Sequence, residues 1–427
     1  MSAIRDILKN VPLPKMLKVR QDFDDSKVVD VPKELHKGLS RPDISDTVKP
    51  GMRIAITCGS RGIDNYALII KELVDFCKSK AAHPFIVPAM GSHGGAKATG
   101  QLQICKSLGV SEEYCGCPIH SSMEIIEVGR SDEGHPVFID KFAAKADGII
   151  VVNRIKGHTG FSGSYESGLM KMLAIGLGKQ YGASVTHQAG YGHMPLLIHL
   201  FGKCIIQNTN IMFAVGLIDN AYDKTCRIAV MKGGEIEREE PKLLEESRAH
   251  MARLLPEYAD ALIVDWMGKN ISGAGMDGNI TGRSSSPFFK KTNFKAGKLA
   301  VLNLTNESFG NMHGVGNADV ISKRIFDKAS LEATYPNSIT STTLKADAIP
   351  VMMPNDKLAI QCAIKTSNCE DENNPQVIRI KNTLQIAEIW VSEAMVARVS
   401  GIKGMTVIGE PEDWGFDAEG NLLDLER

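Results

Sequence analysis

The 427-residue chain has no long apolar run and no excess of charge of either sign. No window approaches the roughly 20 apolar residues that a membrane-spanning helix requires. With 49 basic and 50 acidic residues the formal net charge is −1, so electrostatics give no reason to expect nucleic acid or an anionic membrane as the main partner. The N-terminal segment mixes charges of both signs with short apolar runs, unlike a secretion signal. We therefore expect a soluble, cytoplasmic protein.

The motifs of several common enzyme classes are missing as well. No C-x-x-C pair occurs among the nine cysteines, and their odd number and scatter indicate reduced thiols and not a disulfide framework. A catalytic zinc site usually draws its ligands from a compact motif such as H-E-x-x-H, and a serine nucleophile usually lies on a G-x-S-x-G elbow. Neither motif occurs, although GFSGS around Ser162 lies near the second. The sequence therefore argues against a zinc hydrolase and against a nucleophilic triad.

Strand patterns followed by helical periodicity recur along the chain, which is longer than one hydrophobic core normally supports. This is typical of α/β folds with Rossmann-like, mostly parallel sheets. A long Gly-rich coil after the predicted strand 259–266 marks a change of domain. We expect a cofactor-binding, catalytic domain over residues 1–256, a second α/β domain over 257–404, an active site in the cleft between them, and a tail, 405–427, that packs back on the first domain. The alternating pattern of residues 15–31 predicts an edge hairpin.

Two βα units present polar side chains at the same edge of the first predicted sheet. Strand 52–57 runs into a turn that contains Arg61, and strand 83–89 runs into a Gly-rich turn that contains His93. Open α/β sheets bind ligands at the carboxyl ends of their strands, and a guanidinium there can grip a carboxylate or phosphate. The alternatives are that Arg61 caps a turn and that His93 is an ordinary turn residue. The glycines match neither G-x-G-x-x-G nor the P-loop.

The stretch 153–190, which follows a predicted buried strand at 147–152, concentrates the residues with spare chemical capability. His158, Lys171 and His187 lie thirteen and sixteen residues apart, on a Gly- and Ser-rich loop and a helix rich in small residues. Imidazoles suit proton transfer at neutral pH, and a lysine amine can anchor a cofactor covalently. The residues alone therefore indicate acid/base chemistry on a small molecule that bears a carboxylate, with a metal or a bound cofactor as an open alternative.

The segments PAMGSHGG and HTGFSGSYESGLMKM, followed by His187, resemble the nickel-dependent lactate racemase family of 2-hydroxyacid racemases and epimerases. The resemblance implies a nickel-pincer nucleotide as cofactor, supplied by separate cofactor-biosynthesis enzymes. It also implies inversion at C2 of a 2-hydroxyacid by reversible hydride transfer to that cofactor, with a proton acceptor on each face of the substrate.

The roles that the resemblance assigns fall on nine residues. His93 and His158 resemble the catalytic histidines, and Lys171 and His187 resemble the cofactor tether and the nickel ligand. The remaining assignments are Gly94 and Ser162 for cofactor binding, and Arg61, Lys269 and Asn270 for substrate binding.

The chain also departs from the family pattern. The turn at Arg61 lacks the usual Asp-x-Thr-Arg-Pro-like segment, and the longer interval before Lys171 leaves Lys156 and Lys179 as alternative tethers. We expect a different hydroxyacid, such as a polyhydroxy sugar acid bound through Asn270, Asn279 and Thr281. Two other functions stay open: a metal-assisted lyase or dehydratase of sugar acids, and a non-catalytic homologue that binds a small molecule. The sequence leaves homo-oligomerisation undecided.

Overall fold

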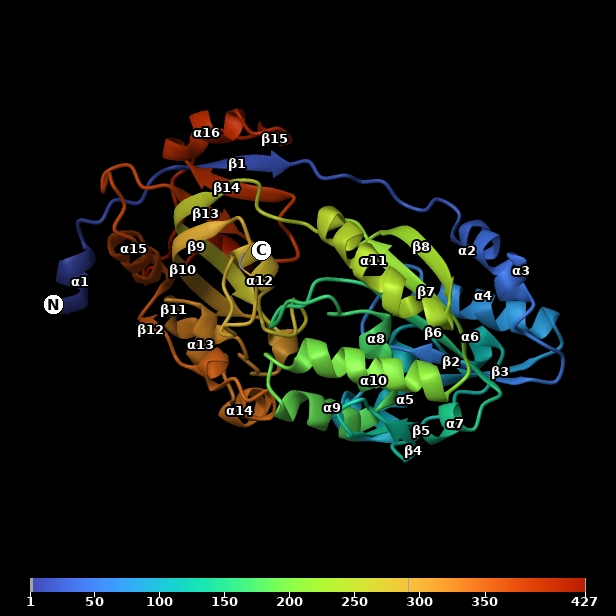
Figure 1. Ribbon diagram of the computed structural model, residues 1–427. Coiled ribbons are helices and arrows are strands. Elements are labelled where there is room, and N and C mark those ends of the chain that lie inside the picture. Colours follow the sequence, from blue (N-terminus) through green and yellow to red (C-terminus); the bar gives the residue numbers. More distant parts are fainter. Residues whose placement is uncertain (1–2, 291, 427) are drawn as a thin grey trace. The chain divides into compact units, whose positions relative to one another are not determined.

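The computed structural model describes residues 3–290 and 292–426 and divides into two compact units (Figure 1). Unit 1 contains the chain up to Phe23 and from Ala252 onward, and unit 2 contains Asp24–Met251. Each unit is built on its own α/β sheet, as the sequence predicted. The predicted boundary at residue 256 lies close to the second crossing between units, but the first segment of the chain belongs to the opposite unit. Within the described residues, no helix has the length and apolar character to cross a membrane.

Unit 2 is organised around a five-stranded sheet of order β3-β2-β6-β7-β8, in which β8 alone runs antiparallel. A two-stranded antiparallel sheet, β4-β5, accompanies it. The strands are β2 (Arg53–Cys58), β3 (His83–Pro88), β4 (Ile125–Arg130), β5 (Pro136–Asp140), β6 (Gly148–Arg154), β7 (Ile211–Asp219) and β8 (Thr225–Lys232).

Helices cover both faces of this sheet, because each face contributes apolar side chains to a separate core. Helices α8 to α11 pack on one face, and α2, α4 and α5 pack on the other (Figure 1). The helices of unit 2 are α2 (Val31–Leu39), α3 (Pro42–Ser45), α4 (Tyr66–Ser79), α5 (Ala98–Ser107), α6 (Glu112–Cys115), α7 (Lys141–Ala144), α8 (Leu169–Lys171), α9 (Lys179–Gln188), α10 (Met194–Asn208) and α11 (Ile236–His250).

Unit 1 contains an eight-stranded sheet of order β12-β11-β10-β9-β13-β14-β1-β15. The strands from β12 to β13 are parallel, and β14, β1 and β15 pair antiparallel. The strands are β1 (Met16–Gln21), β9 (Tyr258–Met267), β10 (Lys295–Leu304), β11 (Val320–Ser322), β12 (Val351–Met353), β13 (Val377–Ile380), β14 (Glu388–Ser392) and β15 (Met405–Val407). The helices are α1 (Ala3–Leu8), α12 (Gly278–Thr281), α13 (Lys323–Lys328), α14 (Leu331–Thr340), α15 (Asp356–Thr366) and α16 (Val396–Ser400).

The structure bears on two expectations about the ends of the chain, and the first of them is wrong. Residues 15–31 form no hairpin, because β1 lies between β14 and β15 and residues 24–30 contain no strand. The tail from residue 405 packs on unit 1, which also contains the N-terminal segment of the chain: Trp414 donates from Nε1 to the Pro14 carbonyl at 2.8 Å, and Leu422 enters an apolar core of unit 1. Alternation of apolar and polar residues predicts a strand, but it does not predict which distant strand pairs with it.

The strand order in the sheet of unit 2 reverses between β2 and β6. The chain passes from β2 outward to β3 and then returns to the other side of β2 as β6, which makes this position the topological switch point where open α/β sheets bind ligands. The backbone ladder between the two strands ends at Ile56 and Ile150. Beyond it the Thr57 hydroxyl accepts the N–H of Val152 at 2.9 Å. The loops that follow β2 and β6 therefore start on either side of the predicted binding position.

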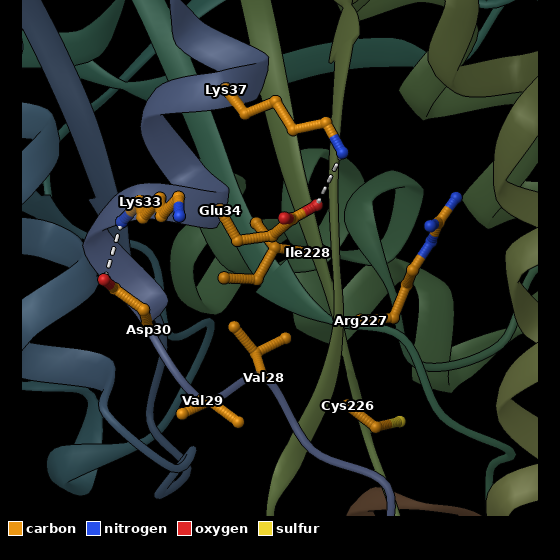
Figure 2. Close-up of a pocket in the computed structure, with 9 residues that line it drawn as sticks. All are labelled: Val28, Val29, Asp30, Lys33, Glu34, Lys37, Cys226, Arg227 and Ile228. Carbon is orange, nitrogen blue, oxygen red and sulfur yellow. Dashed lines mark hydrogen bonds and ion pairs between the residues drawn. The ribbon is translucent and has the colours of Figure 1, made fainter.

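A pocket of about 500 Å³ lies at the edge strand β8 (Figure 2). Its mixed lining includes an ion pair of 3.8 Å between Lys37 and Glu34. None of the residues that the sequence singled out lines it, so this pocket is not the predicted site. The lining residues are Val28, Val29, Asp30, Lys33, Glu34, Lys37, Cys226, Arg227 and Ile228.

Small residues bring the helix after the central loop close to the turn that follows β3. Residues Met172–Leu177 form a π-helical segment between α8 and α9, a feature that often occurs at functional sites. Gly91 donates its backbone N–H to the carbonyl of Gly176 at 3.1 Å. A Cβ atom on Gly176 would lie 2.7 Å from the Ala89 carbonyl oxygen, so glycine is required for this approach.

We predict that Gly176→Ala destabilises the protein by about 1–3 kcal/mol, because the added methyl group overpacks the contact with Ala89. The matched control is Gly234→Ala, where a Cβ atom meets nothing within 4 Å. The melting temperature should fall for Gly176→Ala and stay near the native value for Gly234→Ala. Equal melting temperatures for the two variants would contradict the packing argument.

Candidate functional site

Five basic side chains that the sequence singled out lie near one another in unit 2. The positive charge of Lys171 lowers the pKa of both His158 and His187, after the larger effect of burial. His93 also acts on the pKa of His187, and Arg61 acts on that of Lys171. These mutual effects require proximity, so the loops after β2, β3 and β6 and the helix α8–α9 converge on one site.

Two aromatic rings form the frame of this cluster. His158 stacks on Phe161 with ring centroids 4.1 Å apart, and the Lys171 ammonium lies 5.7 Å from the centre of the same ring. Tyr191 meets His158 edge-on at 6.1 Å and His187 at 6.4 Å. A ring fixed between two imidazoles limits their rotation. Phe161 and Tyr191 were not anticipated from the sequence, where nothing distinguishes them from core aromatics.

A buried carboxylate holds the loop of His158. Glu166, only 2% exposed, accepts the backbone N–H groups of His158 at 2.5 Å and of Gly163 at 2.9 Å. Its Oε1 also pairs with Arg248 at 2.6 Å. Charge-assisted bonds of this kind are stronger than neutral ones, so Glu166 fixes the backbone on which the imidazole is mounted. The sequence signal was a lone acidic residue in a Gly- and Ser-rich loop.

The two candidate catalytic histidines are held in opposite tautomers. The Met90 carbonyl can only accept, so Nδ1 of His93, at 2.7 Å, carries a proton and Nε2 of the neutral ring carries the lone pair. The Gly160 N–H can only donate, so Nδ1 of His158, at 3.0 Å, carries the lone pair and Nε2 of the neutral ring carries the proton. One ring therefore presents a proton acceptor and the other a proton donor.

Lys171 and His187 each have a nitrogen atom that is not engaged in a hydrogen bond within the described residues. Burial, with the charge of Arg61 as the next cause, lowers the pKa of Lys171 to about 8, and no hydrogen-bond acceptor for its amine occurs in residues 3–290 or 292–426. Burial and the charge of Lys171 lower the pKa of His187 to about 4. Its buried Nδ1 has no hydrogen-bond partner in the described part of the chain. A neutral amine and a neutral imidazole are the forms that bond to electrophiles and metals.

A guanidinium without a protein partner completes the cluster. Arg61 forms no ion pair or hydrogen bond among the described residues. Its side chain reaches solvent, yet the surrounding protein and the charge of Arg154 lower its pKa. Arg154 is neutralised by Asp219 at 2.8 Å. Arg61 is therefore the group of this site best prepared to receive an anion.

The remaining predicted residues have other surroundings. Gly94 adopts φ +69°, and a Cβ atom there would lie 2.6 Å from the backbone N of Gln101, which explains the glycine by packing against α5. Ser162 is half-buried in the loop of His158. Lys269 and Asn270 belong to unit 1, after β9. Lys269 donates from Nζ to the Gly273 carbonyl at 2.6 Å and to Asn337 at 2.9 Å, so it anchors its own loop.

Conventional protein metal sites are built from several converging ligands. In the described part of the chain, no group of three or more His, Cys, Asp or Glu side chains is arranged to hold a metal ion. A metal ion on His187 would therefore take its other ligands from outside such a cluster.

These features define an α/β protein that combines imidazole, amine and guanidinium groups at the switch point of a Rossmann-like sheet, as acid/base chemistry on a small anion requires. Residues 10–193 match the family model of the lactate racemase N-terminal domain. This part of the chain is therefore similar to the N-terminal domain of lactate racemases, the family that the sequence resembles.

The fold agrees with this assignment. The structure of the lactate racemase apoprotein from Thermoanaerobacterium thermosaccharolyticum is similar, with a TM-score of 0.52 and 13% sequence identity over 87% of this chain and 99% of that one. No curated protein matches the chain.

A second buried carboxyl group lies behind the amine. Glu240, 1% exposed, accepts the N–H of Met170 through Oε2 at 2.7 Å, at the start of the helix that carries Lys171. Burial raises its pKa to about 8. The folded protein therefore keeps a proton on Glu240 at pH values where the unfolded chain, in which the carboxyl group has its ordinary pKa of 4.5, has released it.

Because the pKa of Glu240 is raised in the folded state, the protonated carboxyl group contributes fully to stability below pH 4.5. This contribution is lost as the pH rises toward 8. Glu240→Gln mimics the protonated group, so its melting temperature relative to the native protein should increase across this range. Glu239→Gln on the same helix is the control, since the pKa of Glu239 is lowered by Arg238 and no such increase is expected. A difference that does not vary with pH would refute the assignment.

The lowered pKa of Lys171 gives a direct chemical prediction. Reductive methylation with formaldehyde, followed by peptide mapping, should modify Lys171 at a rate that levels off near pH 8, whereas an ordinary lysine continues to gain reactivity up to about 10.5. The Lys171→Arg variant should lose this modification alone. A Lys171 that reacts only above pH 10 would show that the pKa of its amine is not lowered.

Proposed function

We propose that the protein is an isomerase that inverts C2 of a 2-hydroxyacid. The observation that carries the proposal is the convergence of His93, His158, His187 and Lys171 in one electrostatically coupled site. The match of residues 10–193 to the lactate racemase N-terminal domain supports it. We further propose a cytoplasmic enzyme that depends on separate enzymes for its cofactor.

The donor groups of the site fit a nickel-pincer nucleotide. The unpaired amine of Lys171 would hold it covalently, and the orphaned Nδ1 of His187 would provide a protein ligand to nickel. When bound, such a nucleotide supplies a hydride acceptor beside the substrate. The absence of a protein ligand cluster in the described residues is compatible with this proposal, because the nucleotide supplies the other nickel ligands itself.

The two histidines divide the proton chemistry. Loss of a hydride from C2 requires removal of the hydroxyl proton, which the Nε2 lone pair of His93 can accept. The neutral His158 ring can donate a hydrogen bond from Nε2 to the substrate oxygen, but it cannot give up this proton. To take or return a proton at Nε2, His158 must carry a proton on Nδ1, and this requires release of its contact with Gly160.

The carboxylate of the substrate would bind Arg61, whose guanidinium has no ion-pair partner within the described residues. A bidentate contact would hold the substrate still while C2 is planar. We propose a polyhydroxy acid as substrate, and Lys269 and the exposed Asn270 stay predictions of the sequence for its binding. Asn279 and Thr281 are weaker candidates, since Asn279 is bound to Asp277 and Thr281 is buried.

The test is to coexpress the protein with the enzymes that make the cofactor and to assay a panel of chiral 2-hydroxyacids. Each single enantiomer of the true substrate should approach a fixed ratio of isomers. A substrate deuterated at C2 should keep its deuterium in water, because a hydride is returned to the same carbon. Replacement of that deuterium by solvent hydrogen would instead indicate a carbanion route, as in a lyase or dehydratase.

His93→Ala and His158→Ala should each lower kcat by about 10²–10⁴-fold, the usual contribution of a general acid or base. Both variants should still bind nickel and the cofactor, because Lys171 and His187 are unchanged. His193→Ala, an exposed histidine that lies next to the helix α10, is the control and should retain native activity. No turnover of any 2-hydroxyacid by the loaded native protein would favour the binding-protein alternative.

A further inference from the structure

A second lysine of the same helix is buried and paired with groups of three other residues. Lys179 has no exposed surface, and its ammonium donates to the Pro88 carbonyl and to Oε1 of Gln101, the latter at 3.1 Å. It also forms an ion pair of 3.1 Å with Asp140. Two hydrogen bonds and an ion pair therefore hold the ammonium at a position without solvent exposure, which argues against Lys179 as an alternative tether.

The ammonium decides which way the Gln101 amide faces. Because Oε1 accepts from Lys179, the Nε2 group of this fully buried amide must point the other way, where it donates to the Gly91 carbonyl at 2.9 Å and to the His93 carbonyl at 3.3 Å. A rotated amide would place its NH₂ against an ammonium and its oxygen against two carbonyls. The orientation is therefore unique, and it fixes the turn that carries His93.

Lys179 also lies at the junction of two helical segments. It follows the π-helical segment and begins α9, with a φ of +54° that a lysine rarely adopts. Backbone strain of this kind persists only where the surrounding structure enforces it. The residue thus joins the helix that carries Lys171 and His187 to the turn of His93, through contacts that are entirely buried.

We infer that Lys179, Asp140 and Gln101 form a positioning network that sets the His93 imidazole against the other groups of the site. Asp140 keeps the ammonium in place, the ammonium orients the Gln101 amide, and the amide holds the backbone of the turn from Gly91 to His93. The effect on turnover rests on the proposed function, but the placement of His93 does not.

The experiment compares Lys179→Met and Gln101→Leu with Arg324→Met. Arg324 pairs at 3.0 Å with the fully buried Asp356 of unit 1, so its variant also breaks a buried ion pair, outside the site. The first readout is the nitrogen NMR spectrum of His93 in selectively labelled apoprotein, which distinguishes an Nδ1 proton from an Nε2 proton. Both network variants should lose the single Nδ1–H form of His93, whereas Arg324→Met should keep it.

The second readout uses the loaded enzyme. Displacement of a catalytic group by about 1 Å costs on the order of 10²-fold, so kcat should fall by roughly this factor in both network variants while KM changes less than about twofold, because Arg61 is unaffected. A Gln101→Asn variant is the conservative rescue and should recover part of the rate, since its amide retains the donor.

Two outcomes would overturn the inference. A native His93 spectrum in Gln101→Leu, which retains Lys179, would show that the amide does not position the imidazole, even if Lys179→Met fails to fold. A loss of thermal stability like that of Arg324→Met without any change in kcat would show a purely structural ion pair. A native enzyme without isomerase activity would refute the proposed function alone, because the NMR comparison would still decide the network.

Discussion

Positive charge that lacks matching negative charge is the constraint on which this site depends. Arg61 lies close enough to Lys171 to lower the pKa of its amine, and Lys171 in turn lowers the pKa of His158. Glu166 is already engaged by Arg248 and by two backbone N–H groups. The site therefore keeps the imidazoles of His158 and His187 neutral and the amine of Lys171 partly neutral until an anion arrives. The same uncompensated positive charge therefore favours the binding of an anion and lowers the pKa values of the groups that would carry out the chemistry.

Local patterns were sufficient to predict much of unit 2. The strand expected at 52–57 is β2, and the apolar segment 147–152 forms most of β6, because both are continuous apolar runs that end in Gly or polar residues. The motif resemblance was enough to single out His93, His158, Lys171 and His187, which the fold then brings together. Loop residues at the ends of parallel strands converge whatever the details of the side chains between them.

What the sequence did not reveal depends on partners. Gln21 is buried because its amide donates to the carbonyl of Ile386, 365 positions away, and no periodicity records such a pairing. Lys171 and Lys179 are alike in sequence, yet Lys171 has no hydrogen-bond acceptor in the described residues, whereas Lys179 has two and an ion pair with Asp140 as well. The tautomers of the histidines are likewise decided by the backbone groups of Met90 and Gly160.

The interruption of unit 1 by the whole of unit 2 has a consequence for biosynthesis. Strand β1 leaves the ribosome first, but both strands that flank it, β14 and β15, are translated near the end. Asp24–Met251 is continuous, so unit 2 can complete its own core while β1 waits with unsatisfied backbone groups. Nascent chains are thus expected to acquire the histidine-bearing half early, and the closing of the eight-stranded sheet becomes the late, aggregation-exposed step of maturation.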